Sequence, residues 1–227
     1  MLKYNPIISS IDIEETRRYA GLSSAHNFSE QLLKDACNEA QVFIHPQAIW
    51  SYYPYDAANS MILAPTPLSL SGNSIKKHLS SAHQVIVLAV TIGEALETEI
   101  SKHFSTGGYT AALLLDAAGT AAVEAAADKA ASIISQHAQT QGLRAIWRFS
   151  PGYGDWNITV QPQIHMLAQG AEIGIEVTDS CMLTPRKSIT ALIGLEPHGQ
   201  TKNKPCCETK TCQHCNQTNC LARRESR

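Results

Sequence analysis

Arg148 begins a nine-residue segment, RFSPGYGDW, whose residue types could bind a small molecule. An arginine side chain carries a permanent positive charge and a planar fork of donors that matches a carboxylate. Gly152 and Gly154 allow close approach of the backbone or a positive φ, and Tyr153 and Trp156 add aromatic faces with polar edges. These features suit a flat, partly charged ligand. A second interpretation stays open, because a Pro-Gly turn flanked by aromatic residues is usually only a turn.

A second chemically capable group is a set of cysteines near the end of the sequence. Four of them have the spacing Cys-x4-Cys-x2-Cys-x4-Cys, with Cys206 as an additional thiol: Cys207, Cys212, Cys215 and Cys220. In an intracellular chain, crowded cysteines favour metal ligation over disulfides, and four thiolates can hold zinc or an iron-sulfur cluster. His214 could be a ligand or hydrogen-bond to one. The alternative is a flexible tail that is prone to oxidation.

The elements that would position Arg148 follow from hydrophobic periodicity. Residues 85–90 have the pattern of a buried strand, and residues 91–104 have that of an amphipathic helix with Ile92, Leu96, Ile100 and Phe104 at intervals of four. From about residue 110 to 141 alanine dominates, which predicts the longest helix, with Gly142 at its end.

The segment around Arg148 lies between further predicted elements. Residues 144–149 form a strand candidate that runs directly into the Pro-Gly turn. Pro162 could occupy the first turn of the next helix, and residues 173–178 and 188–195 are strand candidates.

The N-terminal part is predicted to be helical at first and irregular later. Asp12 could cap a short helix that ends near Gly21, and a second helix begins near Asn27. Its buried face is expected to carry four residues: Leu32, Leu33, Ala36 and Ala40. Residues 44–73 hold four prolines and three tyrosines, and we expect loops and short extended pieces there.

These elements predict a mixed α/β (α+β) fold. The spacing does not decide strand direction; we expect a mixed, largely antiparallel sheet covered by the long alanine-rich helix, followed by a cysteine-rich C-terminal tail. The expected division is a helical and loop region at 1–80, a core at 81–198, and a metal-binding tail at 199–227.

Composition limits the classes of function. With 44% hydrophobic and 17% charged residues among 227, the chain can bury a normal core. A formal net charge of -2 argues against nucleic acid or an anionic membrane as a partner. We see no apolar run of about 18 residues and no signal-peptide pattern, so we expect a cytoplasmic protein that does not enter a membrane.

Three segments resemble the activation domain of cobalamin-dependent methionine synthase. RFSPGYGDW is similar to that family's Arg-x-x-Pro-Gly-Tyr motif, the most specific of the three. VTDSCMLTPRKSITALIGL resembles its threonine, acidic residue, serine and proline-turn segment, and LLLDAAGTAAVEAAADKA resembles its small-residue helix with an acidic ligand. The resemblance covers roughly Val85 to Leu195.

The resemblance implies an S-adenosylmethionine site. Arg148 would hold the methionine carboxylate, and the backbone near Ser150 and Gly152 would contact the ligand. Tyr153 would lie beside the sulfonium or the adenosine, and Glu124 would pair with the ammonium group or the ribose. No side chain would act as acid or base. Asp128, one turn after Glu124, is expected to be structural or exposed.

The sequence departs from the family at two points in this site. The family usually has a proline after the tyrosine, where this chain has Gly154. The family site also uses an N-terminal aspartate and a C-terminal tyrosine; Asp56 and Tyr55 are the only candidates for the N-terminal contribution.

The implied activity is methyltransferase-type reactivation in trans. No cobalamin signature occurs in the sequence, so the cobalamin would be carried by a separate corrinoid-binding methyltransferase protein, such as a split methionine synthase. An electron donor such as a flavodoxin or ferredoxin would reduce inactive cob(II)alamin to cob(I)alamin, which S-adenosylmethionine then methylates. The alternatives are a non-catalytic module that docks onto a corrinoid protein and a small metal-cluster redox protein that uses the cysteine tail.

Overall fold

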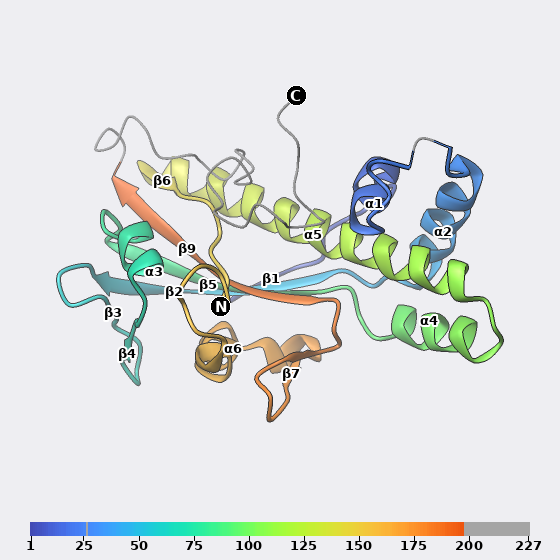
Figure 1. The fold of residues 1–227 in the computed structure, drawn as a ribbon. Coiled ribbons are helices and arrows are strands. Elements are labelled where there is room, and N and C mark those ends of the chain that lie inside the picture. The colour runs from blue at the N-terminus through green and yellow to red at the C-terminus, as the bar shows by residue number, and fades with distance from the viewer. Residues whose placement is uncertain (26, 198–227) are drawn as a thin grey trace.

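The computed structural model describes residues 1–25 and 27–197, and a seven-stranded sheet lies at the centre of this part, with helices on both faces (Figure 1). Its order is β4-β3-β2-β5-β9-β6, and β1 pairs with β2; every pairing is antiparallel. The predicted α+β class, with a largely antiparallel sheet and one long helix, is confirmed.

The strands of this sheet are β1 (Leu2–Tyr4), β2 (Gln47–Asp56), β3 (Met61–Ile62), β4 (Leu68–Ser69), β5 (Gln84–Thr91), β6 (Leu143–Ala145) and β9 (Ser188–Pro197). A separate two-stranded sheet consists of β7 (Glu176–Val177) and β8 (Leu183–Thr184). The helices are α1 (Ile13–Tyr19), α2 (Glu30–Phe43), α3 (Asn73–His78), α4 (Ala95–Ser105), α5 (Tyr109–Thr140) and α6 (Gln161–Ala168), with 3-10 turns η1 (Ile158–Val160) and η2 (Gly170–Ile173).

Strand β5 is buried on both faces because it lies between two hydrophobic layers. Alternate side chains of a strand point to opposite faces. Ile86, Leu88 and Val90 belong to the cluster that contains α5, whereas Val85 and Val87 belong to the cluster that contains α6. The continuous apolar pattern seen in the sequence is therefore that of a central strand.

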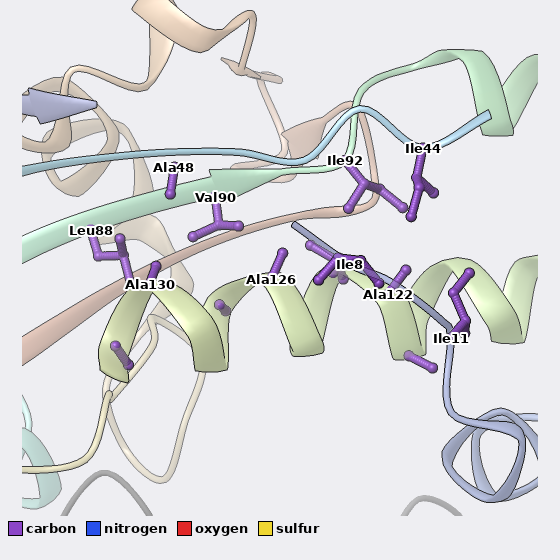
Figure 2. Close-up of a cluster of buried hydrophobic side chains, with 14 of the residues drawn as sticks. Ile8, Ile11, Ile44, Ala48, Leu88, Val90, Ile92, Ala122, Ala126 and Ala130 are labelled. Atoms are coloured by element: carbon purple, nitrogen blue, oxygen red, sulfur yellow. The ribbon is translucent and has the colours of Figure 1, made fainter. Parts of the chain in front are cut away.

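Small side chains let α5 pack closely against its neighbours. Figure 2 shows Ala122, Ala126 and Ala130 of α5 facing Leu88 and Val90 of the sheet. An added Cβ on Gly119 would lie 2.6 Å from Cδ2 of Leu96, so α4 also approaches the α5 backbone. Alanine and glycine here permit distances that larger side chains would prevent.

Helix α5 is long and apolar enough to span a membrane by length and composition. Its most apolar 18-residue window has a mean hydropathy of 1.3, but 61% of that window is buried inside the protein. This burial is what a core helix requires.

The expectation of loops and short extended pieces across residues 44–73 was wrong for β2, which occupies ten of these residues, whereas β3 and β4 are short extended pieces. Proline in the segment misled the interpretation. Pro54 lies near the end of β2, where its carbonyl accepts from Leu63 N at 2.9 Å. A proline near a strand end removes few of the hydrogen bonds between strands.

Several smaller expectations also needed correction. Leu32, which was expected on the buried face of α2, is 45% exposed, and Cys37, which was not named for that face, is buried there. Phe104 is also exposed. The strand predicted at 144–149 ends at Ala145 and continues only as isolated pairing, and the one predicted at 173–178 is limited to Glu176–Val177.

Both sides of the predicted division at residue 80 contribute to the sheet, since residues 47–54 of β2 pair with all of β5. The division into regions stays a prediction. The cysteine-rich tail lies outside the described residues.

Candidate functional site

Arg148 lies between two points at which the chain is fixed to β9. Ile146 N donates to Gly194 O, and Phe149 N donates to Leu192 O, each at 2.9 Å. Phe149 is buried in the cluster on the α6 side of the sheet, whereas the Arg148 side chain reaches α5. The backbone pairing therefore sets the position of the guanidinium.

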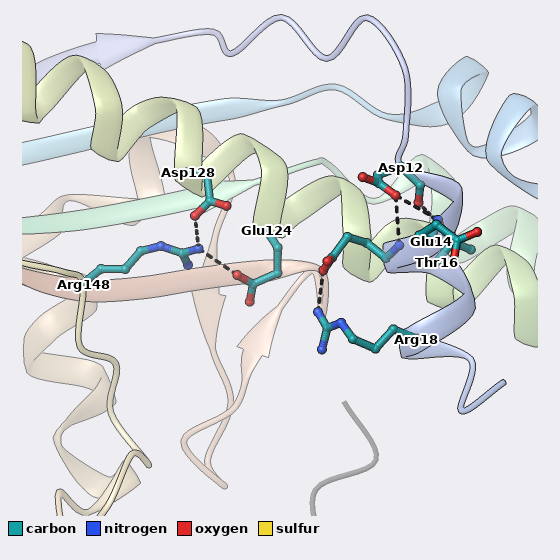
Figure 3. Close-up of polar contacts among 8 residues, drawn as sticks. Asp12, Glu14, Thr16, Arg18, Glu124, Asp128 and Arg148 are labelled. Atoms are coloured by element: carbon teal, nitrogen blue, oxygen red, sulfur yellow. Dashed lines mark hydrogen bonds and ion pairs between the residues drawn. The ribbon is translucent and has the colours of Figure 1, made fainter. Parts of the chain in front are cut away.

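Two carboxylates of α5 hold the Arg148 guanidinium (Figure 3). Its Nη2 is 2.8 Å from Glu124 Oε2 and 2.6 Å from Asp128 Oδ1. Residues four apart share one face of a helix, which explains why both acids reach the same nitrogen. The arginine side chain is 17% exposed, against 31% for Glu124 and 48% for Asp128. The cation is thus enclosed, and the acids face partly to solvent.

The pairing keeps Arg148 charged. Burial alone would lower the pKa of Arg148, but the charges of Glu124 and Asp128, with their hydrogen bonds, raise that pKa above its ordinary value. Both bonds use Nη2, and Nε and Nη1 form no hydrogen bond to any residue within 1–25 or 27–197. The N–H groups of Nε and Nη1 can therefore donate to another acceptor, such as a ligand.

The turn after Arg148 is closed by its own backbone. Gly152 N donates to Trp156 O at 2.8 Å, and Tyr153 N donates to Ser150 O at 3.1 Å. Gly152 has a φ of +89°, a conformation that favours glycine. Tyr153 is 46% exposed, and its ring packs edge-on against Phe149, with ring centroids 5.7 Å apart. The turn thus presents an aromatic ring at the surface near the end of the Arg148 segment.

Gly154 and Asp155 attach this turn to α3. Asp155 accepts from Asn73 N at 2.7 Å and from Ser74 N at 2.8 Å, and these bonds lower the pKa of its carboxyl. Gly154 has a φ of +56°, and an added Cβ would lie 2.7 Å from Ser74 Oγ. Proline requires a φ near -65°. The departure from the family's proline at this position therefore follows from the local backbone.

Helix α1 borders the site at Glu124. Burial raises the pKa of the Tyr19 hydroxyl, and the negative charge of Glu124 raises it further, so Tyr19 stays neutral beside this acid. The Arg18 guanidinium lies 4.0 Å from the Tyr19 ring centroid and pairs with Glu15 at 2.6 Å. Helix α1 thus brings Tyr19 close to Glu124, a neighbour that the sequence pattern did not indicate.

The structure brings together only part of the predicted site. Arg148 and Glu124 are in contact, while Ser150, Gly152 and Tyr153 follow in the attached turn. Asp128 is exposed, as expected, but it also pairs with Arg148. The four-residue spacing between Glu124 and Asp128 already indicated that both acids lie on one face of the helix.

Neither Tyr55 nor Asp56 joins Arg148. Tyr55 is buried in the cluster on the α6 side of the sheet, away from the α5 side. Asp56 is the last residue of β2, and its carboxylate accepts from Ala58 N and Asn59 N in the turn that follows. Their part in the site therefore stays a prediction without support from a contact with Arg148.

Lys187 binds polar residues on the same face of α5 as Glu124 and Asp128, nearer the start of the helix. Its Nζ is 2.9 Å from both Asp116 Oδ1, two turns before Glu124, and Thr120 Oγ1, one turn before Glu124. Lys187 is 9% exposed and begins the approach to β9. Polar residues at four-residue steps therefore bind two cations, Lys187 and Arg148. The predicted metal ligands Cys207, Cys212, Cys215 and Cys220 lie outside the described residues.

Comparison with known proteins identifies a structural likeness. The crystal structure of the MetH reactivation domain bound to AdoHcy matches with a TM-score of 0.58, covering 88% of this chain and 80% of that chain. The two share a fold. Their sequences are 13% identical, so the likeness concerns the fold alone. No protein-family model and no curated protein matches the sequence.

Proposed function

We propose that this chain binds S-adenosylmethionine beside Arg148 and acts in trans to reactivate a corrinoid methyltransferase. The observation that carries the proposal is the enclosed Arg148–Glu124 ion pair at the start of the Pro-Gly-Tyr turn. The shared fold supports it, because the solved domain with that fold is bound to AdoHcy.

The charges of the site suit the amino-acid part of S-adenosylmethionine. That part carries one carboxylate and one ammonium group. Arg148 would donate to the carboxylate from Nε and Nη1, and Glu124, which is partly exposed, would accept from the ammonium group. A guanidinium already fixed by two acids loses little freedom when the ligand binds, which favours affinity.

The turn would contact the remainder of the ligand. Tyr153 is half-exposed, and its ring would attract a sulfonium through a cation-π contact. Gly152 N–H and Ser150 C=O already bond inside the turn, so we assign these residues close contact and shape. Bound S-adenosylmethionine would supply a methyl group to reduced cobalt carried by the partner. The residues of this chain would bind and orient the ligand and need not transfer a proton.

Calorimetric titration of the full chain with S-adenosylmethionine tests the proposed site. We expect saturable binding of one equivalent, and a weaker affinity for Glu124→Gln because the amide keeps an acceptor but loses the charge. Glu14→Gln is the matched control, since Glu14 is 71% exposed on α1. Absence of binding in the parent chain would refute the proposal, and equal affinities for Glu124→Gln and the parent would remove Glu124 from the site.

A further inference from the structure

Glu39, Glu99 and His103 form a group of possible metal ligands away from the Arg148 site. Glu39 lies on α2, and Glu99 and His103 lie one turn apart on α4. Their nearest ligand atoms are all within 4.8 Å of one another. His103 Nε2 is 2.6 Å from Glu39 Oε1 and 3.9 Å from Glu99 Oε1. Two helices therefore direct an imidazole and two carboxylates to one point.

We propose that this group binds a first-row divalent cation, with zinc as the first candidate, and joins α2 to α4. An imidazole nitrogen and carboxylate oxygens are ligands that zinc accepts, whereas magnesium and calcium prefer oxygen alone. Three protein ligands leave further positions to water. The site concerns a structural cation and does not depend on the proposed S-adenosylmethionine site.

The distances are compatible with small adjustments. Zinc lies about 2.0 to 2.2 Å from nitrogen and oxygen ligands, so tetrahedral ligands are separated by about 3.4 Å. The His103–Glu39 distance of 2.6 Å is shorter than this value, and the His103–Glu99 distance of 3.9 Å is longer. The side chains are 26%, 33% and 15% exposed for His103, Glu39 and Glu99. Side-chain shifts of under about 1 Å would therefore bring both His103 distances to that value, and the two glutamate oxygens already lie within 4.8 Å of each other.

The surrounding charges also favour a cation. Both residues of α4 lie in its last two turns, and the C-terminal end of a helix attracts positive charge. The competing cation is Lys102, whose Nζ is 2.8 Å from Glu99 Oε1. Lys102 is 68% exposed, so its flexible side chain can move into solvent and release Glu99. With a neutral imidazole, two carboxylates against one lysine leave a negative charge in excess.

Zinc titration of a full-length parent variant tests the proposal. Cys206, Cys207, Cys212, Cys215 and Cys220 are replaced by serine in this parent, because thiolates would otherwise bind the added zinc. After treatment with a chelator, we expect one equivalent of zinc to bind and to raise the melting temperature. Cobalt(II) should give an absorption spectrum without a thiolate charge-transfer band.

Substitutions of the ligands identify the site. Changing an outer-sphere partner of a metal site typically weakens affinity by about 10- to 100-fold, so we expect His103→Gln and Glu39→Gln to weaken it by at least about tenfold. His137→Gln, on α5, and Glu30→Gln, on α2, are matched controls that should bind as the parent does. Lys102→Gln should bind zinc more tightly because it removes the competing cation, and this variant keeps every ligand. The proposal is wrong if the parent binds no zinc, or if His103→Gln and Glu39→Gln bind it as the parent does.

Discussion

Arg148→Ala is the change that most directly tests the candidate site. It removes the one cation held by both Glu124 and Asp128, and leaves the two acids one helical turn apart without it. The acids are 31% and 48% exposed, so water can solvate them in the variant. We therefore expect a loss of about 1 kcal/mol in the free energy of unfolding, as for partly exposed ion pairs, and a folded protein.

The expected loss of ligand affinity is larger than the loss of stability. A hydrogen bond between charged groups contributes about 1.5 to 3 kcal/mol, which corresponds to a change in Kd of roughly 10- to 100-fold. The variant also exposes the ligand's carboxylate to Glu124 and Asp128 without an intervening cation. This repulsion places the expected loss toward the upper end of that range. Arg148→Lys should recover only part of the affinity, because it restores the charge without the planar fork.

Calorimetry with S-adenosylmethionine measures the change, and circular dichroism establishes that each variant is folded. Arg186→Ala is the matched control, because Arg186 is 69% exposed and its distances to Asp116 and Glu97 are 3.8 and 3.9 Å. We expect its Kd to equal that of the unaltered chain. An unchanged Kd for folded Arg148→Ala would refute the placement of the ligand beside Arg148.

Three further predictions concern the turn and the tail. Asp155 has a lowered pKa in the folded protein, so its stabilising contribution is present above the unfolded pKa of about 3.9 and is lost as the pH falls through the folded value. Thermal melts from pH 2 to 6 should therefore show a smaller change of melting temperature with pH for Asp155→Ala than for the parent chain. An identical change in both would contradict this assignment. Gly154→Pro should lower the melting temperature and weaken S-adenosylmethionine binding, because proline cannot adopt a φ of +56°; a variant as stable as the parent would show that the turn tolerates another backbone. Deletion of residues 203–227 should leave the Kd for S-adenosylmethionine within about twofold, since the Arg148–Glu124 pair and the described core lie outside that segment; a tenfold loss by calorimetry would assign the tail a part in binding.

The sequence predicted elements well where a single periodicity dominates. The alanine-rich run gave α5 to within a residue or two, and the apolar run at 85–90 gave β5, because helix propensity and burial on both faces agree with the local pattern. β2 was missed because its stability comes from pairing with β1 and β5, which are distant in sequence. Pro54 suggested a loop in the sequence, but in the structure it lies near the end of a paired strand.

The candidate site was predictable only for its linear motif and one acid. The contact between Arg148 and Glu124 requires residues 24 apart to meet, and the resemblance placed both residues around one ligand without predicting their direct contact. Asp128 could have been included from its helical spacing. Tyr19 had no comparable local signal, since its approach to Glu124 depends on how α1 packs against α5. Tertiary packing therefore decides which polar side chains complete the site.

The two acids around Arg148 also bear on how a spent ligand would leave. One guanidinium against two carboxylates leaves the cluster with one negative charge in excess, and neutral Tyr19 does not alter this balance. Under the proposed function, S-adenosylmethionine carries a sulfonium charge that disappears when the methyl group is transferred. Attraction between the cluster and the ligand then weakens with the chemistry itself. The surplus acid would thus favour the reactant over the product and promote their exchange after each methylation.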